Sequence, residues 1–404
     1  MKKLCLIALL YSFTFGNGLQ NAIDSASSGD IIELSSGVYS GNIIINKPIT
    51  IDGKDRSAII KGDGKGDVIK INSSNVKLLN LTIENSGNSH TTIDSAISCD
   101  SASGVEIINN AIKNSLFGVN FKQCNGSKIV DNFITSKPVD LGLRGDGIRL
   151  WYSHDNIVQN NHLSKSRDMV VWYSSNNQIR KNYGEYGRYS LHFMYAGKNL
   201  VEENIFKYNS VGIFFMFSSG TTARKNQVLN STGAFGVGIG MKDTSDFIIQ
   251  DNILAYNARG LYLDQSPFQP GTTNVYEDNQ ILYNTVGVQF HATQHKSIFN
   301  RNDFIGNMEI AINDTPGSKI DINEWSNNYF DDYAGFDRDK DGIGDIEYKN
   351  FTYLDSLWQY YPNLRLFYGS AIMSILNFIS KLAPFSEPEL LITDTSPHME
   401  SYHE

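Results

Sequence analysis

Three side chains in the middle of the chain carry donor atoms for a soft metal ion. His192 supplies an imidazole, and Met194 and Met216 supply thioethers; both donor types suit Cu(I). His192 and Met194 are two residues apart, so a β-strand turns them to the same face. Met216 follows Met194 after 22 residues, which places the thioethers side by side if 22 residues make one coil of a repeating fold. We therefore predict a weak, readily released Cu(I) site; the alternative is a methionine pair that only packs.

A second group of donors consists of carboxylates near the carboxyl end. They stand at positions 1, 3, 5 and 9 of one loop: Asp337, Asp339, Asp341 and Asp345. With Gly342 at position 6, this is the spacing of a calcium-binding loop. Tyr348 replaces the glutamate expected at position 12. The loop is predicted to hold structural Ca²⁺, and a plain acidic turn is the alternative.

A sequence repeat defines the element that must position the soft donors. An asparagine followed closely by an aliphatic or aromatic residue recurs at intervals of 21 to 29 residues. These asparagines are Asn110, Asn132, Asn161, Asn182, Asn204, Asn226, Asn252, Asn279 and Asn302. The spacing fits one coil of a parallel β-helix with three short strands, and the asparagines can stack as an amide ladder. We predict an all-β, single-stranded right-handed parallel β-helix over residues 17–330.

Period-two alternation assigns the two faces of one strand in each coil. Its first, third and fifth positions are large and mostly apolar, and are predicted to face the core: Ile148, Leu150, Tyr152, Met169, Val171, Tyr173, Leu191, Phe193, Tyr195, Ile213, Phe215 and Phe217. Met241 is predicted to face inward as well. The second and fourth positions face outward, and the middle coils place Arg149, Trp151, Trp172, His192, Met194, Phe214 and Met216 there.

An apolar row on an outer face marks a contact site more often than chance. Trp151, Trp172 and Phe214 are therefore predicted to bind a partner. Two alternatives remain: the faces are assigned in reverse, or the chain's own C-terminal segment covers the row.

The two cysteines that follow the N-terminal segment are predicted to remain apart. Cys99 lies 11 residues before Asn110, whereas Cys124 lies 8 before Asn132. Along an extended strand this offset amounts to roughly 10 Å, too far for a disulfide. Cys99 is predicted to be a small core residue.

The N-terminal residues indicate export. Lys2 and Lys3 precede a short apolar run, which predicts a cleavable signal peptide over residues 1–16. Residues 19–24 form a short helical segment that would cap the first coil. A net charge of −9 argues against a nucleic-acid partner.

The C-terminal part is predicted to comprise an acidic calcium-like loop (331–348) and a docking segment (349–404). An amphipathic helix is expected at 366–382, too short to span a membrane. Its apolar residues gather on one broad face: Phe367, Ile372, Ile375, Leu376, Phe378, Ile379 and Leu382. The helix either binds a partner or packs on the last coil of its own β-helix.

Several motifs carry a resemblance to a known family. The opening L-Q-N-A-I-D is similar to β-helical carbohydrate-binding and sugar-hydrolase repeats. More specific are G-I-R-L-W-Y-S (147–153), V-V-W-Y-S (170–174) and N-N-Y-F-D-D-Y-A-G-F-D-R-D-K-D-G-I-G-D (327–345). Together they resemble the NosD family of nitrous oxide reductase maturation. The resemblance implies a periplasmic, non-enzymatic protein docked on an ABC-type permease and ATPase similar to NosY and NosF, with a NosL-like copper lipoprotein as donor.

The alternative function is carbohydrate chemistry or binding, which the same fold supports. A polysaccharide lyase or epimerase needs clustered carboxylates with a basic partner. The candidate acids Asp146, Asp155 and Asp168 are scattered in the sequence. No aligned carboxylate pair is predicted to face the arginines that could line a groove, which are Arg149, Arg167 and Arg188. A sugar-binding module with Trp151 as a stacking platform is the third hypothesis.

Overall fold

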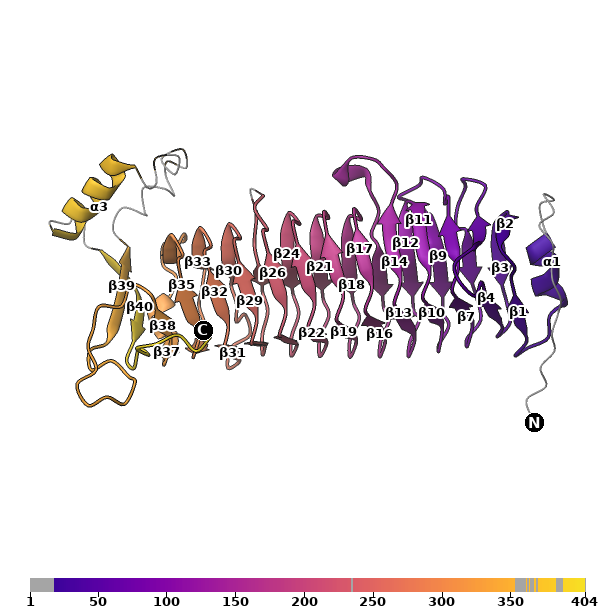
Figure 1. Ribbon diagram of the computed structural model, residues 1–404. Helices are drawn as coiled ribbons and strands as arrows, with labels where there is room; N and C mark the ends of the chain where they lie inside the picture. The colour runs from indigo at the N-terminus through magenta and orange to yellow at the C-terminus, as the bar shows by residue number, and fades with distance from the viewer. Residues whose placement is uncertain are drawn as a thin grey trace. The chain divides into compact units, whose positions relative to one another are not determined.

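The computed structural model describes residues 18–233, 235–352, 361, 363, 367, 370–382 and 388–403. The predicted signal peptide lies outside them. The chain divides into two compact units, Met1–Gln227 and Val228–Glu404. Each unit is a right-handed parallel β-helix in which successive coils contribute strands to three sheets (Figure 1). The predicted fold class is confirmed.

In the first unit, strands of successive coils pair in parallel in each sheet. The first sheet contains β1 (Ile31–Glu33), β4 (Thr50–Asp52), β7 (Lys77–Leu79), β10 (Glu106–Ile108), β13 (Lys128–Val130), β16 (Ile157–Gln159), β19 (Gln178–Arg180), β22 (Leu200–Glu202) and β25 (Thr222–Arg224). The second contains β2 (Gly37–Ser40), β5 (Ala58–Lys61), β8 (Thr82–Glu84), β11 (Ala111–Ser115), β14 (Phe133–Ser136), β17 (His162–Ser164), β20 (Tyr183–Glu185) and β23 (Ile205–Lys207). The third contains β3 (Ile43–Ile45), β6 (Ile69–Ile71), β9 (Ser95–Asp100), β12 (Phe117–Lys122), β15 (Ile148–Trp151), β18 (Asp168–Trp172), β21 (Tyr189–Met194) and β24 (Val211–Met216).

The second unit also has three sheets, and the residues of β26 (Gln227–Leu229) span the division between the units in sequence. Its first sheet contains β28 (Ile248–Gln250), β31 (Asn274–Glu277), β34 (Ser297–Asn300), β37 (Glu324–Ser326), β40 (Glu389–Asp394) and β39 (Tyr348–Thr352). The second contains β29 (Ile253–Ala255), β32 (Gln280–Leu282), β35 (Asp303–Ile305) and β38 (Tyr329–Phe330), and the third contains β27 (Ile239–Lys242), β30 (Arg259–Asp264), β33 (Val286–His291) and β36 (Glu309–Asn313). The 3₁₀ turns Leu141–Leu143 and Ile320–Ile322 lie in connections between strands.

Buried asparagines form amide ladders along the coils, as the repeat predicts. In the first unit, each Nδ2 donates to the Oδ1 of the next rung at 2.9–3.1 Å, from Asn110 through to Asn226. In the second unit, Asn252, Asn279 and Asn302 continue the pattern to Asn328 at 2.9 Å. Because these amides are buried, each bond satisfies a polar group that water cannot reach.

Helix α1 (Gly18–Ser25) caps the first coil. Leu19 and Ile23 are buried, and the Gln20 side chain exchanges two hydrogen bonds with the Ile44 backbone in β3. The open edge of this strand is thereby paired, which a terminal coil requires.

The C-terminal end is closed by two strands that lie far apart in sequence. Strand β40 pairs in parallel with β37, and β39 pairs antiparallel with β40. The Asp394 carboxylate accepts the last ladder hydrogen bond, from Asn328 Nδ2 at 2.8 Å. The stretch between the two strands carries helix α3 (Ala371–Leu382) (Figure 1). The segment expected to serve docking therefore also completes the last coil.

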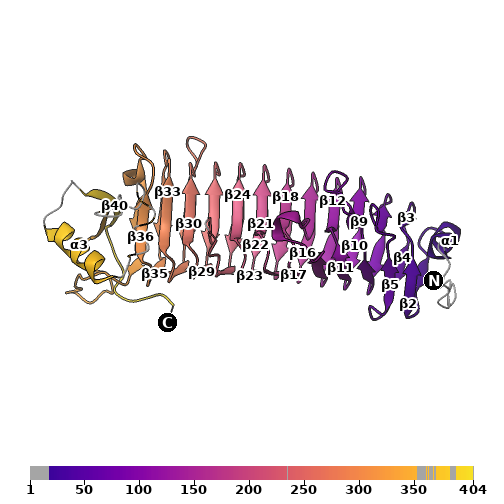
Figure 2. The same ribbon diagram turned by 90° about the horizontal axis from the view of Figure 1, so that it is seen from above.

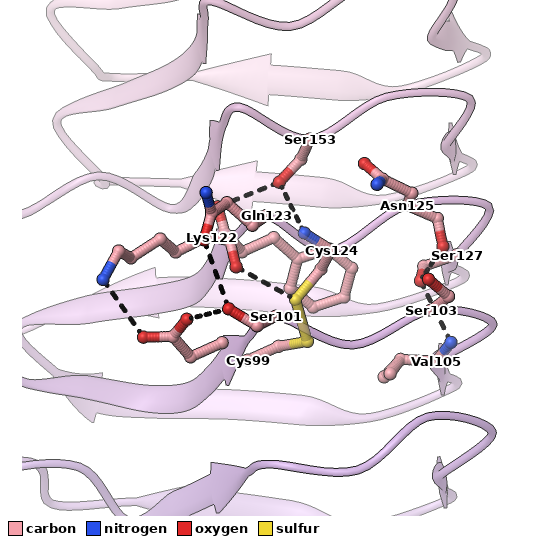
Figure 3. Close-up of a disulfide and its surroundings, with 12 residues drawn as sticks. Cys99, Ser101, Ser103, Val105, Lys122, Gln123, Cys124, Asn125, Ser127 and Ser153 are labelled. Atoms are coloured by element: carbon pink, nitrogen blue, oxygen red, sulfur yellow. Dashed lines mark hydrogen bonds and ion pairs between the residues drawn. A yellow bond between two sulfur atoms is a disulfide. The ribbon is translucent and has the colours of Figure 1, made fainter.

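The prediction that the cysteines remain apart is wrong, because Cys99 and Cys124 form a disulfide (Figure 3). Their Cα atoms lie 6.5 Å apart. The residues before Cys124 are not extended: Gln123 has φ 55° and turns the chain back at the end of β12. Because of this turn, the offset of three residues between the two cysteines does not separate them by the roughly 10 Å expected for an extended strand.

We expect reduction of this disulfide to lower the free energy of unfolding by about 3 kcal/mol, because the bond closes a loop of 25 residues in the unfolded chain. Urea unfolding with and without reductant measures the change. A Cys99→Ala, Cys124→Ala variant should unfold identically in both conditions. Equal stability of the oxidised and fully reduced wild-type protein would contradict the prediction.

Candidate functional site

The outer face of the third sheet in the first unit brings the predicted soft donors together. Lys122, Trp151, Trp172, Met194 and Met216 occupy one row across β12, β15, β18, β21 and β24. These strands lie side by side in Figure 2, where most of them are labelled. The inward prediction for Met169 and Met241 is confirmed, because both are fully buried.

His192 lies beside this row on the same outer face, with neighbours in the adjacent coils. Its Nε2 atom is 3.4 Å from Met216 Sδ, and Met194 is the register partner of Met216. Roughly 3.5 Å also separates a nitrogen and a sulfur that bind one tetrahedral ion. The structure thus brings the imidazole and the Met216 thioether to a separation that one ion could span, with Met194 as the register partner of Met216 in the adjacent coil.

The surroundings favour a neutral imidazole. His192 is only 6% exposed although it faces outward. Burial lowers its pKa to about 4, so the ring is uncharged at neutral pH. Its Nδ1 atom is buried, and within the described part of the chain it has no hydrogen-bond partner. A neutral imidazole with a nitrogen facing thioethers is the form that binds a soft ion.

The predicted partner-binding aromatics are half-buried. Trp151 and Trp172 pack 5.5 Å apart between ring centroids. The Arg149 guanidinium lies 4.6 Å from the first ring and 5.8 Å from the second, a cation–π arrangement. Phe214 is half-buried and in register with His192. These rings frame the donor cluster on the outer face.

The prediction that the fifth strand position faces the core is wrong. Tyr152, Tyr173, Tyr195 and Phe217 have φ near 50° and end their strands. Their rings stack outside at 4.8–5.1 Å between centroids, and Tyr195 is 47% exposed. In other coils the same turn position holds a polar residue, which indicates from the sequence that this position faces solvent: Gln123, Asp243 and Gln265.

The expected absence of aligned carboxylates is also wrong. Asp146 and Asp168 are buried in adjacent coils, and Arg167 contacts the first at 3.0 Å. Arg188 binds the second through Nε at 3.0 Å and through Nη2. Burial and the neighbouring Asp168 raise the pKa of Asp146 to about 6. The sequence distance hid these pairs, because the coil repeat brings residues about 21 apart into contact.

The carboxylates of the C-terminal loop meet in part. Oxygens of Asp337, Asp339 and Asp341 lie within 4.8 Å of one another. Asp345 instead accepts a hydrogen bond from the Arg338 backbone. Repulsion by Asp341 raises the pKa of Asp339. This is the charge arrangement that a bound cation relieves.

Helix α3 leaves the predicted apolar residues exposed. Phe378 is 63% exposed, and Met373 is buried. The other apolar residues named for docking are exposed too: Phe367, Ile372, Ile375, Leu376, Ile379 and Leu382. Of the predicted helical range 366–382, residues 366, 368 and 369 lie outside the described residues. Among the described residues, no helix is long and apolar enough to cross a membrane.

Comparisons with known proteins define the class of this chain. A right-handed β-helix model matches residues 67–187. The family described as periplasmic copper-binding protein (NosD) matches residues 130–335, which include the donor cluster. The fold and the match together place the molecule in a family of β-helical proteins that is described as periplasmic and copper-binding.

The chain belongs to the NosD family. A Pseudomonas aeruginosa protein named probable ABC transporter binding protein NosD is 28% identical over 87% of this chain and 84% of its own length. The Stutzerimonas stutzeri protein of the same name is 27% identical over 87% and 83%.

A solved structure shares the fold. The A-module of the Azotobacter vinelandii mannuronan C-5 epimerase AlgE6 aligns with a TM-score of 0.59 at 17% identity, over 74% of this chain and 92% of its own. At this identity the likeness concerns architecture alone.

Proposed function

We propose that this protein is a non-enzymatic periplasmic accessory factor that binds Cu(I) weakly and relays it during maturation of the copper sites of nitrous oxide reductase. It acts while docked on an ABC-type complex similar to NosY and NosF, with a NosL-like lipoprotein as the copper donor. The family description as copper-binding and the relatives' name as ABC transporter binding proteins support this role.

The observation that carries the proposal is the contact of His192 Nε2 with Met216 Sδ beside Met194. All three donors are uncharged, so the site suits a soft monovalent ion better than a divalent one. Both methionines are half-buried, which leaves the donors within reach of a partner. Three uncharged ligands on a strand face release an ion readily, as a relay requires.

The docking element of this proposal is α3. Because β39 and β40 pair with each other, the segment that bears the helix is anchored at both ends. Exposed apolar residues recur every three or four positions along it, which fits a groove that takes one face of a helix. The groove belongs to the membrane permease of the ABC complex.

Structural Ca²⁺ at Asp337, Asp339 and Asp341 completes the proposal. The loop also pairs with the C-terminal strand region, because Gly344 N donates to Pro397 O at 2.8 Å. A cation there would strengthen the closure of the last coil.

The carbohydrate alternative has less support. The two buried carboxylates that could serve acid–base chemistry are paired with Arg167 and Arg188. The Trp151 ring is contacted by Trp172 and Tyr173, which limits its use as a sugar platform.

Replacing both thioethers should weaken Cu(I) binding at least about tenfold, equivalent to ~1.4 kcal/mol. In Met194→Leu, Met216→Leu the side-chain volume is kept, so the fold should be unaffected. Anaerobic competition with a chromophoric Cu(I) chelator gives the Kd. The control, Met308→Leu, removes a thioether that is 43% exposed in the second unit. An unchanged Cu(I) affinity of the double variant would contradict the proposed copper site.

The substitution Phe378→Asp should abolish co-purification with the ABC permease and ATPase, because a carboxylate in an apolar groove costs several kcal/mol. Cu(I) affinity should not change. Phe268→Asp is the matched control, since Phe268 is 50% exposed in a loop outside α3. If Phe378→Asp retains the permease at the level of the control, docking lies elsewhere.

Calcium should raise the Tm of the wild-type protein, by about 2–4 °C for each kcal/mol of binding free energy. Asp339→Asn, Asp341→Asn should respond little to calcium and should match the wild type in excess chelator. Asp321→Asn, another exposed aspartate of the second unit, is the control. A Tm difference between wild type and double variant that persists in chelator would mean that the loop is only an acidic turn.

A further inference from the structure

A β-bulge interrupts the third sheet next to the donor cluster. Between β18 and β21, Asp168 pairs with Tyr189 and Val170 pairs with His192. Two steps along β18 therefore match three steps along β21. Bulges of this kind redirect side chains and occur beside functional sites.

The extra residue changes which side chains share a face. In a regular strand, residues three apart point to opposite faces. Here Tyr189 and His192 are three apart, yet their rings stack with centroids 4.8 Å apart and planes 20° apart. The bulge thus places a tyrosine ring flat against the imidazole of the predicted copper ligand.

On the Nδ1 side, ring contacts rather than a hydrogen bond orient His192. A histidine that binds metal ordinarily donates its second ring N–H to a carboxylate, a backbone carbonyl or a water. Here Nδ1 has no such partner among the described residues. Tyr189 covers one face of the ring, and Trp172 contacts it edge-on with centroids 5.9 Å apart.

Tyr189 is itself held by an ion pair whose carboxylate is buried. Its backbone N–H donates to Asp168 Oδ1 at 3.1 Å. Arg188 binds both oxygens of the same carboxylate, whose side chain is 1% exposed. The Arg188 guanidinium also lies 5.0 Å from the centroid of the Tyr189 ring. A bidentate arginine–carboxylate pair has a defined geometry, and the hydrogen bond from the Tyr189 backbone to Asp168 therefore restrains the position of the tyrosine.

We propose that Tyr189, held by the Asp168–Arg188 pair, is a positioning residue that fixes the His192 ring with Nε2 toward Met216. This inference rests on the proposed Cu(I) site. Without the tyrosine ring, the His192 imidazole can rotate about its last side-chain bond. Binding of an ion must then order the ring, and the loss of conformational entropy weakens the affinity.

Two readouts test this role on the full mature protein. Long-range ¹H–¹⁵N spectra of ¹⁵N-histidine-labelled, metal-free protein report the order and the tautomer of each ring; His192→Phe assigns the signal among the 8 histidines. Chelator competition reports the Cu(I) affinity. Tyr189→Leu should replace one narrow His192 signal by broadened or multiple signals, and should raise the Kd about fivefold or more. Tyr189→Phe keeps the stacking ring and should restore both.

A second variant covers the case in which Tyr189→Leu does not fold. Arg188→Lys keeps the charge but loses the two-point contact, and should disturb the His192 signal in the same direction. If the folded variants leave this signal unchanged, Tyr189 has no positioning role. If instead His192→Phe binds Cu(I) like the wild type, the copper site is wrong, and the metal-free spectra still decide the positioning role separately.

Discussion

Parallel hydrogen bonding between equivalent positions of successive coils underlies the β-helix of each unit. Each strand pairs in register with the strand one coil before it, and the buried asparagines repeat that register in their side chains. Neighbouring coils are therefore about 4.8 Å apart at every position. A residue type that recurs at one position becomes a row on the surface. The outer row from Trp151 to Met216 and the tyrosine stack from Tyr152 to Phe217 both follow from this constraint.

This regularity is broken locally beside His192. Rows alone give parallel side chains with one neighbour on each side, which suits packing. The bulge in β21 adds one residue, and the Tyr189 ring then stacks on His192 in addition to the neighbours from the adjacent coils. The buried aspartate–arginine pairs lie at the same end of the strands, where the chain enters the sheet. These ion pairs fix the positions of side chains at the bulge, where the regular strand pairing is interrupted.

The sequence predicts what depends on the period of the repeat. The asparagine spacing was sufficient for the β-helix, the ladder and the register that brings Met194 beside Met216. The errors concern turns. A single residue with positive φ follows each strand of the third sheet from β9 to β33, so Tyr195 points outward and Cys124 returns toward Cys99. Non-glycine residues adopt that conformation at a small cost, which hydrophobicity does not reveal. The stack of Tyr189 on His192 depends on a bulge, and a bulge shifts the alternation on which the assignment of faces relies.

The position of Asp394 in the chain has a consequence for the order of folding. The buried carboxylate of Asp394 completes the asparagine ladder, because it accepts hydrogen bonds from both the backbone N–H and the side-chain amide of Asn328. The rung is supplied by β40, which follows α3 in sequence. During synthesis or export, every earlier coil can form as its residues emerge, because each depends only on its neighbours. The last coil must wait until α3 has passed. The second unit is thus closed only in molecules that already carry their exposed helix, which links completion of the fold to possession of this apolar surface.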